Sequence, residues 1–117
     1  MRMRIISVTN LNTGWLLADQ ARIAETVADR LTGLLGTSHL PPGCGLLLIP
    51  CYSIHTIGMA YAIDAIFLDW DYNVLKVVND LRPMRAASCR GGAMTLELPA
   101  GTAVRTGTQA GHRLQAG

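Results

Sequence analysis

The sequence predicts a mainly β fold with a minor α component. We expect a single domain over residues 1–117, an antiparallel β sandwich or barrel with one short α-helix near residues 26–35. Half of the 117 residues are hydrophobic and 15% are charged, a composition typical of a chain that folds around a core. Short apolar runs recur between turn-forming residues, and a single segment has the period of a helix.

The expected strands are short apolar runs separated by glycine, proline, asparagine or aspartate, the residues that favour turns. Short runs at such spacing are typical of a sandwich or barrel. Residues 69–73 are rich in turn formers and are expected to form a hairpin loop. The expected strands cover residues 3–8, 15–18, 21–24, 46–49, 51–57, 62–68, 74–78 and 94–98.

Residues 26–35 have the period of an amphipathic helix, because apolar side chains at i, i+4, i+7 and i+8 share one helical face. In this segment they are Val27, Leu31, Leu34 and Leu35. Thr26 is the expected N-cap, and Asp29 suits the positive end of the helix dipole. Gly36 is expected to end the helix in the left-handed conformation.

Composition and charge argue against several functional classes. No apolar stretch approaches the ~18 residues of a membrane span, and the first residues lack the apolar segment of a secretory signal. The net charge of +2 is too small to indicate nucleic-acid binding. Three cysteines without CxxC spacing are expected to be reduced thiols. The sequence therefore predicts a cytoplasmic protein with no membrane or nucleic-acid partner, and it leaves the oligomeric state open.

Residues 50–71 are the most informative stretch, because His55 and Asp64 stand in otherwise apolar, strand-like sequence. Burying a charge without a partner is costly, so such groups are expected to pair or to serve a ligand. If residues 58–61 form a hairpin loop, His55 stands directly opposite Asp64, and Tyr52 opposite Phe67. Cross-strand neighbours are close enough for an imidazole to hydrogen-bond a carboxylate.

The predicted pair of His55 and Asp64 has three interpretations. It fixes the strand register and nothing more, or it lines a ligand pocket, or His55 is a general acid or base that Asp64 orients. Arg30 on the expected helix is an alternative partner for Asp64. Thiol catalysis is disfavoured because Cys51 lies ~13 Å along the strand from His55. The cysteine and histidine spacings match no known metal pattern, so no metal and no cofactor are expected.

Further polar residues are candidates for a site. Arg82 and Arg85 lie in an expected loop, where guanidinium groups can bind a carboxylate or phosphate, although a solvated basic loop is the simpler interpretation. Glu97 falls on the strand face opposite Leu96, so we expect it to face solvent or the rim of a site. Trp70 is expected to be a packing residue.

Several motifs resemble one known family. Arg30 is followed by GLLG at residues 33–36 and GCGLLL at residues 43–48, and LELPAG occupies residues 96–101. A central run is similar to SIHTFGMRFPIDVVFLD. Its matching positions are Ser53, Ile54, His55, Thr56, Gly58, Met59, Ile63, Asp64, Phe67, Leu68 and Asp69. Over roughly residues 21–114 the chain resembles the bacterial and archaeal family called domain of unknown function 192.

This resemblance implies a mainly β sandwich or barrel with a short helix, and no established activity. The chain departs from the family pattern at several positions: Thr37, Ala60, Ala62, Met84 and His112. Two of these changes remove a basic residue, one of them directly after Met59. If the family binds an anion there, this chain is expected to bind it weakly.

Together these observations predict a small non-catalytic domain that binds a polar or anionic small ligand or a protein partner. The candidate ligand-binding residues are His55, Asp64, Arg30, Met59, Arg82 and Arg85. The alternatives are a small enzyme that uses His55 as acid or base, oriented by Asp64, and a purely structural or interaction domain.

Overall fold

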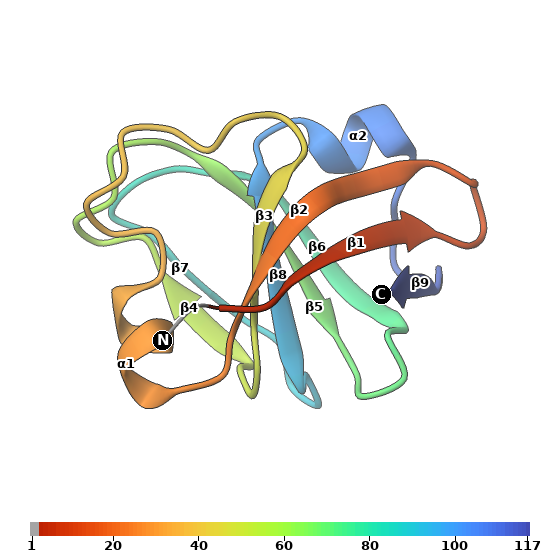
Figure 1. The fold of residues 1–117 in the computed structure, drawn as a ribbon, viewed down its shortest axis with the longest axis horizontal. Helices are drawn as coiled ribbons and strands as arrows, with labels where there is room; N and C mark the ends of the chain where they lie inside the picture. The colour runs from red at the N-terminus through yellow and green to blue at the C-terminus, as the bar shows by residue number, and fades with distance from the viewer. Residues whose placement is uncertain (1–2) are drawn as a thin grey trace.

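The fold is mostly β: a seven-stranded sheet curls into a half-barrel, and a small two-stranded sheet lies beside it (Figure 1). The computed structural model describes residues 3–117. Its elements are β1 (Ile5–Asn10), β2 (Leu16–Ala24), α1 (Val27–Thr32), β3 (Cys44–Leu48), β4 (Ser53–His55), β5 (Ile63–Leu68), β6 (Val74–Leu81), β7 (Ala86–Ser88), β8 (Met94–Pro99), α2 (Thr102–Thr106) and β9 (Leu114–Ala116). The mainly β prediction is confirmed.

The main sheet has the strand order β6-β5-β8-β3-β2-β1-β9, and the small sheet pairs β4 with β7. All neighbours run antiparallel except β2 and β3, which run parallel. At one end the sheet curls far enough for its two edges to meet. There the Val74 N–H donates to the His112 carbonyl at 2.8 Å, and the Leu114 N–H donates to the Tyr72 carbonyl at 2.9 Å.

The central strands β3, β5 and β8 are buried on both faces, so the main sheet separates two cores. Alternate residues of each strand enter different cores because side chains alternate across a strand. The first core contains Leu47, Ile66, Leu96 and Leu98, together with residues of β1, β2 and β9. The second core contains Leu46, Leu48, Ala65 and Phe67, together with Leu34 and Ile54. Burial on both faces explains why these strands are nearly continuous apolar runs.

Helix α1 begins as predicted but is shorter than predicted. The Thr26 side chain accepts a hydrogen bond from the Asp29 N–H at 3.0 Å, which confirms the N-cap. The helix ends at Thr32, where Gly33 at φ 50° serves as the C-cap in place of Gly36. The expected apolar face is largely uncovered, because Val27 and Leu31 are exposed and α1 has no buried residue.

A second helix, α2, lies at the opposite end of the molecule from α1 and was not predicted (Figure 1). Its five residues are too few to show a helical period. Its N-cap is Gly101, which has no side chain with which to cap it. The usual signs of a helix start are therefore missing from the local sequence.

The predicted hairpin between residues 51–57 and 62–68 is wrong. β4 pairs with β7, which places His55 opposite Ala86, whereas β5 pairs with β8, which places Asp64 opposite Leu98. Because β5 is flanked by β6 and β8, it has no free edge for β4. The second predicted hairpin loop, residues 69–73, is confirmed, since the Asp69 N–H donates to the Asn73 carbonyl between β5 and β6.

Candidate ligand-binding pocket

A pocket of about 670 Å³ lies between α1, the end of β3, β4 and the turns at residues 69–70 and 91–93. This volume falls within the range of ~300–1,000 Å³ that is typical of small-molecule sites. Five exposed apolar or aromatic side chains line it: Val27, Leu31, Leu35, Tyr52 and Trp70. Exposed side chains of this size gathered around one hollow are typical of a surface that binds something.

Glu97 of β8 lines the same pocket from the second-core side of the main sheet. The residue is only 4% exposed, and burial raises the pKa of its carboxyl to about 7. Its neighbours on the adjacent strands, Leu46 and Ala65, are apolar and offer no side-chain hydrogen-bond donor. A carboxylate in such surroundings keeps its charge only at a cost in free energy.

Within residues 3–117 the Glu97 side chain makes no hydrogen bond, and the ion pairs there join Arg4 to Glu25 and Arg82 to Asp80. Burial alone raises the pKa of the Glu97 carboxyl. In the same range, no fully enclosed side-chain oxygen is left unpaired. The Glu97 oxygens must therefore reach the open space of the pocket. The pocket thus has an apolar rim and an unpaired acid in its interior.

The other charged groups of the pocket are already engaged. Arg30 Nη1 donates to the Glu25 carbonyl at 2.7 Å and to the Ile49 carbonyl at 3.2 Å. The Asp69 carboxylate accepts hydrogen bonds from the N–H groups of Asp71 and Asn73 and from the Asn73 side chain. The hydrogen bond from the Asn73 side chain is the main reason why the pKa of Asp69 is lowered.

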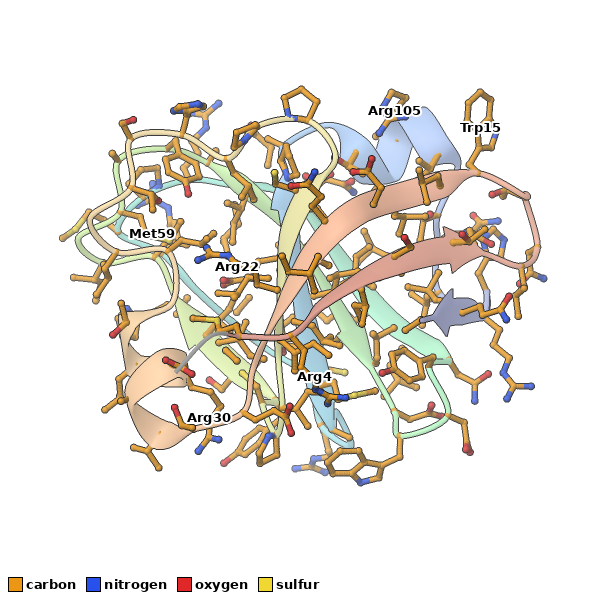
Figure 2. All side chains as sticks on the ribbon, in the orientation of Figure 1. Arg4, Trp15, Arg22, Arg30, Met59 and Arg105 are labelled. Carbon is orange, nitrogen blue, oxygen red and sulfur yellow. The ribbon has the colours of Figure 1, made fainter. Side chains whose placement is uncertain are left out.

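Three of the six predicted site residues line this pocket: His55, Arg30 and Met59. His55 is exposed at the end of β4, and Met59 is half-buried on the loop that follows. Figure 2 shows Arg30 on α1 and Met59 on that loop, so the two approach the pocket from different elements.

Asp64 does not belong to the pocket. It lies on the first-core face of β5, whereas His55 belongs to the small sheet on the second-core side. Its Oδ1 accepts the Asp80 N–H at 2.9 Å, and its Oδ2 accepts the N–H groups of Gly101 at 3.1 Å and Ala103 at 2.9 Å. Asp64 therefore supplies the cap that α2 lacks and also holds the bulge of β6 at Asp80. The predicted pairing of Asp64 with His55 or Arg30 is wrong.

Arg82 and Arg85 also lie outside the pocket lining. Arg82 Nε approaches the Asp80 carboxylate at 3.6 Å on the surface, and Arg85 Nη1 donates to the Met84 carbonyl at 3.3 Å. The buried Thr56 hydroxyl fixes the backbone of this loop by donating to the Arg82 carbonyl and accepting the Arg85 N–H. The loop is ordered by Thr56, and its guanidinium groups do not converge with the pocket residues.

Sequence reasoning missed three pocket residues: Glu97, Trp70 and Tyr52. Glu97 was expected to face solvent or the rim of a site, but β8 is a central strand covered on both sides, and Glu97 is buried in the pocket lining. Trp70 was expected to pack and Tyr52 to face Phe67, yet they are 63% and 64% exposed. The signal for Glu97 was present, since it is the single charged residue of its strand, as Asp64 is of β5.

These features define a class: a small half-barrel domain with a capped second helix and an acid-containing pocket beside the first. The chain belongs to the DUF192 family, described as "Uncharacterized ACR", whose model matches residues 8–116. A search of curated proteins finds no match.

Two solved structures share the fold. A protein of unknown function from Novosphingobium aromaticivorans DSM 12444 superposes with a TM-score of 0.82 at 21% identity, covering 97% of this chain and 84% of that one. A protein from Sinorhizobium meliloti 1021, described as a proposed transcription regulator, gives a TM-score of 0.84 at 21% identity, covering 99% and 96%. At this identity the likeness shows the fold alone. Within residues 3–117, no helix is long and apolar enough to cross a membrane.

Proposed function

We propose that this domain is a non-catalytic binding module that takes a small ligand in the pocket between α1 and β4. The observation that supports this most is the buried Glu97 carboxylate, which faces the pocket without a partner from the chain. Buried polar groups are nearly always paired, so an unpaired one at the wall of a pocket favours a ligand that supplies the missing bond.

The pocket lining changes the kind of ligand that we expect. The sequence favoured a polar or anionic molecule bound by arginines, but Arg82 and Arg85 lie elsewhere and the lining is mostly apolar. An apolar body therefore fits the rim, where Leu31 and Trp70 offer exposed contact area. The proposal also covers a protein partner that inserts an apolar side chain into the pocket.

The geometry does not favour the enzyme in which Asp64 orients His55. Asp64 lies on the other face of the main sheet, and its two oxygens are used by three backbone N–H groups. The enzyme predicted from the sequence needs Asp64 within hydrogen-bond reach of His55, because the carboxylate is to orient the imidazole. His55 contributes to the pocket wall instead.

The experiment is a titration of ¹⁵N-labelled protein with n-octanol, followed by ¹H–¹⁵N NMR. We expect saturable shifts at the Trp70 indole N–H and at the Gly91 and Gly92 amides, and none at the Trp15 indole, because Trp15 lies outside the pocket lining.

Two matched variants test the location. Leu31→Gln removes an apolar group from the pocket rim and should weaken octanol binding by about threefold to fivefold. Leu11→Gln makes the same change at an exposed leucine away from the pocket and should leave binding unchanged. Equal behaviour of the two variants, or shifts scattered over the whole surface, would contradict a binding site at this pocket and favour a purely structural domain.

A further inference from the structure

The ligand class follows from what Glu97 lacks. A buried carboxylate gains most from a partner that donates hydrogen bonds and carries a positive charge. Within residues 3–117 the strand neighbours of Glu97 are the apolar Leu46 and Ala65, and no ion pair involves its carboxylate. A ligand that filled the pocket with apolar groups alone would bury the unpaired acid further and increase its cost.

We infer that this pocket recognises an amphipathic primary amine, with the Glu97 carboxylate as the counter-ion of its ammonium group. This inference rests on the proposed function, since it names the ligand class for the same pocket. The apolar body of the amine would lie along the exposed side chains of the rim, and its ammonium group would donate hydrogen bonds to the Glu97 oxygens.

The aromatic side chains of the rim fit the same ligand. Trp70 and Tyr52 both line the pocket and are more than half exposed, so their ring faces are free to meet a ligand. Ammonium groups are attracted to the faces of aromatic rings, most strongly to tryptophan. An amine passing the rim therefore meets favourable electrostatics before it reaches the acid.

The other charged side chains around the pocket either have hydrogen-bond partners or lie outside its lining, whereas Glu97 has no partner within residues 3–117. On β2, Arg22 stands in the same row as Glu97, with Leu46 between them, but it lines the smaller neighbouring pocket. Arg30 is held by two backbone carbonyls, and the oxygens of Asp69 are used within their own turn. The remaining titratable groups of the lining are His55 on β4 and, just before β4 in the chain, Cys51 and Tyr52.

Proton binding gives this recognition a defined pH dependence. Because burial raises the pKa of Glu97 to about 7, the carboxylate is mostly ionised above neutral pH and mostly protonated at pH 5. The ionised fraction falls about tenfold for each pH unit below the pKa, and the affinity for a cation falls with it. Because His55 also lines the pocket, a Glu97 variant is needed to assign the pH dependence to Glu97.

The test compares three probes with the same apolar tail: octylammonium chloride, n-octanol and sodium octanoate. Each is titrated into ¹⁵N-labelled protein at about pH 8 and about pH 5, and the Trp70 indole N–H reports binding. At pH 8 we expect octylammonium to bind about tenfold or more tightly than either other probe, as a charged hydrogen bond in a desolvated site predicts. At pH 5 this advantage should disappear.

Two variants assign the preference to Glu97. Glu97→Gln keeps the shape and removes the charge, and should abolish the preference for octylammonium while octanol still binds. Glu25→Gln is the matched control, because Glu25 is an exposed carboxylate that pairs with Arg4 outside the pocket. The pH comparison in the unaltered protein keeps the test decisive if the Glu97 variant does not fold.

The outcomes separate this inference from the proposed function. Equal binding of octanol and octylammonium at the pocket would overturn the amine inference and leave the binding module standing. Tighter binding of octanoate would overturn it in favour of an anion site at Arg30. If no probe shifts the Trp70 signal, both proposals fail.

Discussion

Asp64 and Glu97, the two carboxylates buried within residues 3–117, lie on opposite faces of the same sheet in opposite surroundings. Asp64 receives three backbone N–H groups and joins α2 to the sheet. Glu97 receives none and faces a pocket. The contrast shows that burial of an acid does not by itself indicate function, because the number of partners separates a structural carboxylate from a candidate binding group.

The two ends of the molecule also differ in how far their helices are buried. At the α2 end, Thr102, Ala103 and Thr106 are buried, so the helix is part of the core. At the α1 end the helix has no buried residue, and its apolar side chains face the open pocket. The first end contributes stability, and the second presents surface that is available to a ligand.

The largest effect on the free energy of unfolding is expected for a substitution of Asp64, the structural carboxylate. Asp64→Asn should lower the free energy of unfolding by about 3 kcal/mol, because the amide nitrogen would point a donor at N–H groups that need an acceptor. Urea denaturation measures this. Asp71→Asn, the same change at an exposed turn position, should alter stability by less than ~0.5 kcal/mol. Similar losses in both variants would remove the distinction between the two carboxylates.

Replacing Glu97, the carboxylate in the pocket, should change the free energy of unfolding in the opposite direction. The pKa of Glu97 is raised from 4.5 to about 7 on folding, so the folded state binds the extra proton between these values and stability falls as the pH rises. Glu97→Gln should therefore stabilise the protein by about 2 to 3 kcal/mol at pH 8 and have almost no effect at pH 4. Denaturation curves at both pH values test this, and a destabilised variant at pH 8 would mean that Glu97 has a partner.

The smallest effect is expected at His55. His55→Ala should change the free energy of unfolding by less than ~0.5 kcal/mol, since the side chain is exposed at the end of a short strand. A double-mutant cycle with Asp64→Asn should show additive effects within the same limit. A coupling of 1 kcal/mol or more would restore the pairing that the sequence suggested.

The sequence predicted the class of fold because that class depends on local patterns. Alternation and turn residues identify strands wherever they pair, and Thr26 caps its helix through a contact three residues away. Strand pairing depends on distant partners instead. Nothing in residues 50–71 shows that β4 pairs with β7, a segment more than 30 residues later in the chain.

The candidate site was predicted only in part, because some of its features depend on contacts between distant segments. His55 was predicted as a polar residue in an apolar run and Arg30 as a partner for Asp64, and both line the candidate pocket together with Met59. Asp64 was assigned to it because its partners, the backbone N–H groups of Gly101 and Ala103, have no signature in the sequence. Glu97 was not included among the candidate site residues, although it is the single charged residue of an apolar strand, as Asp64 is.

The exposure of the pocket rim has a consequence for how this family can diverge. The strands between the two cores are constrained on both faces, so most substitutions there disturb packing on one side or the other. Rim positions such as Leu31, Tyr52 and Trp70 are mostly exposed, and changes there cost little folding free energy. A lineage can therefore change the side chains of the rim while the scaffold stays the same, as expected for a fold that is retained at 21% identity.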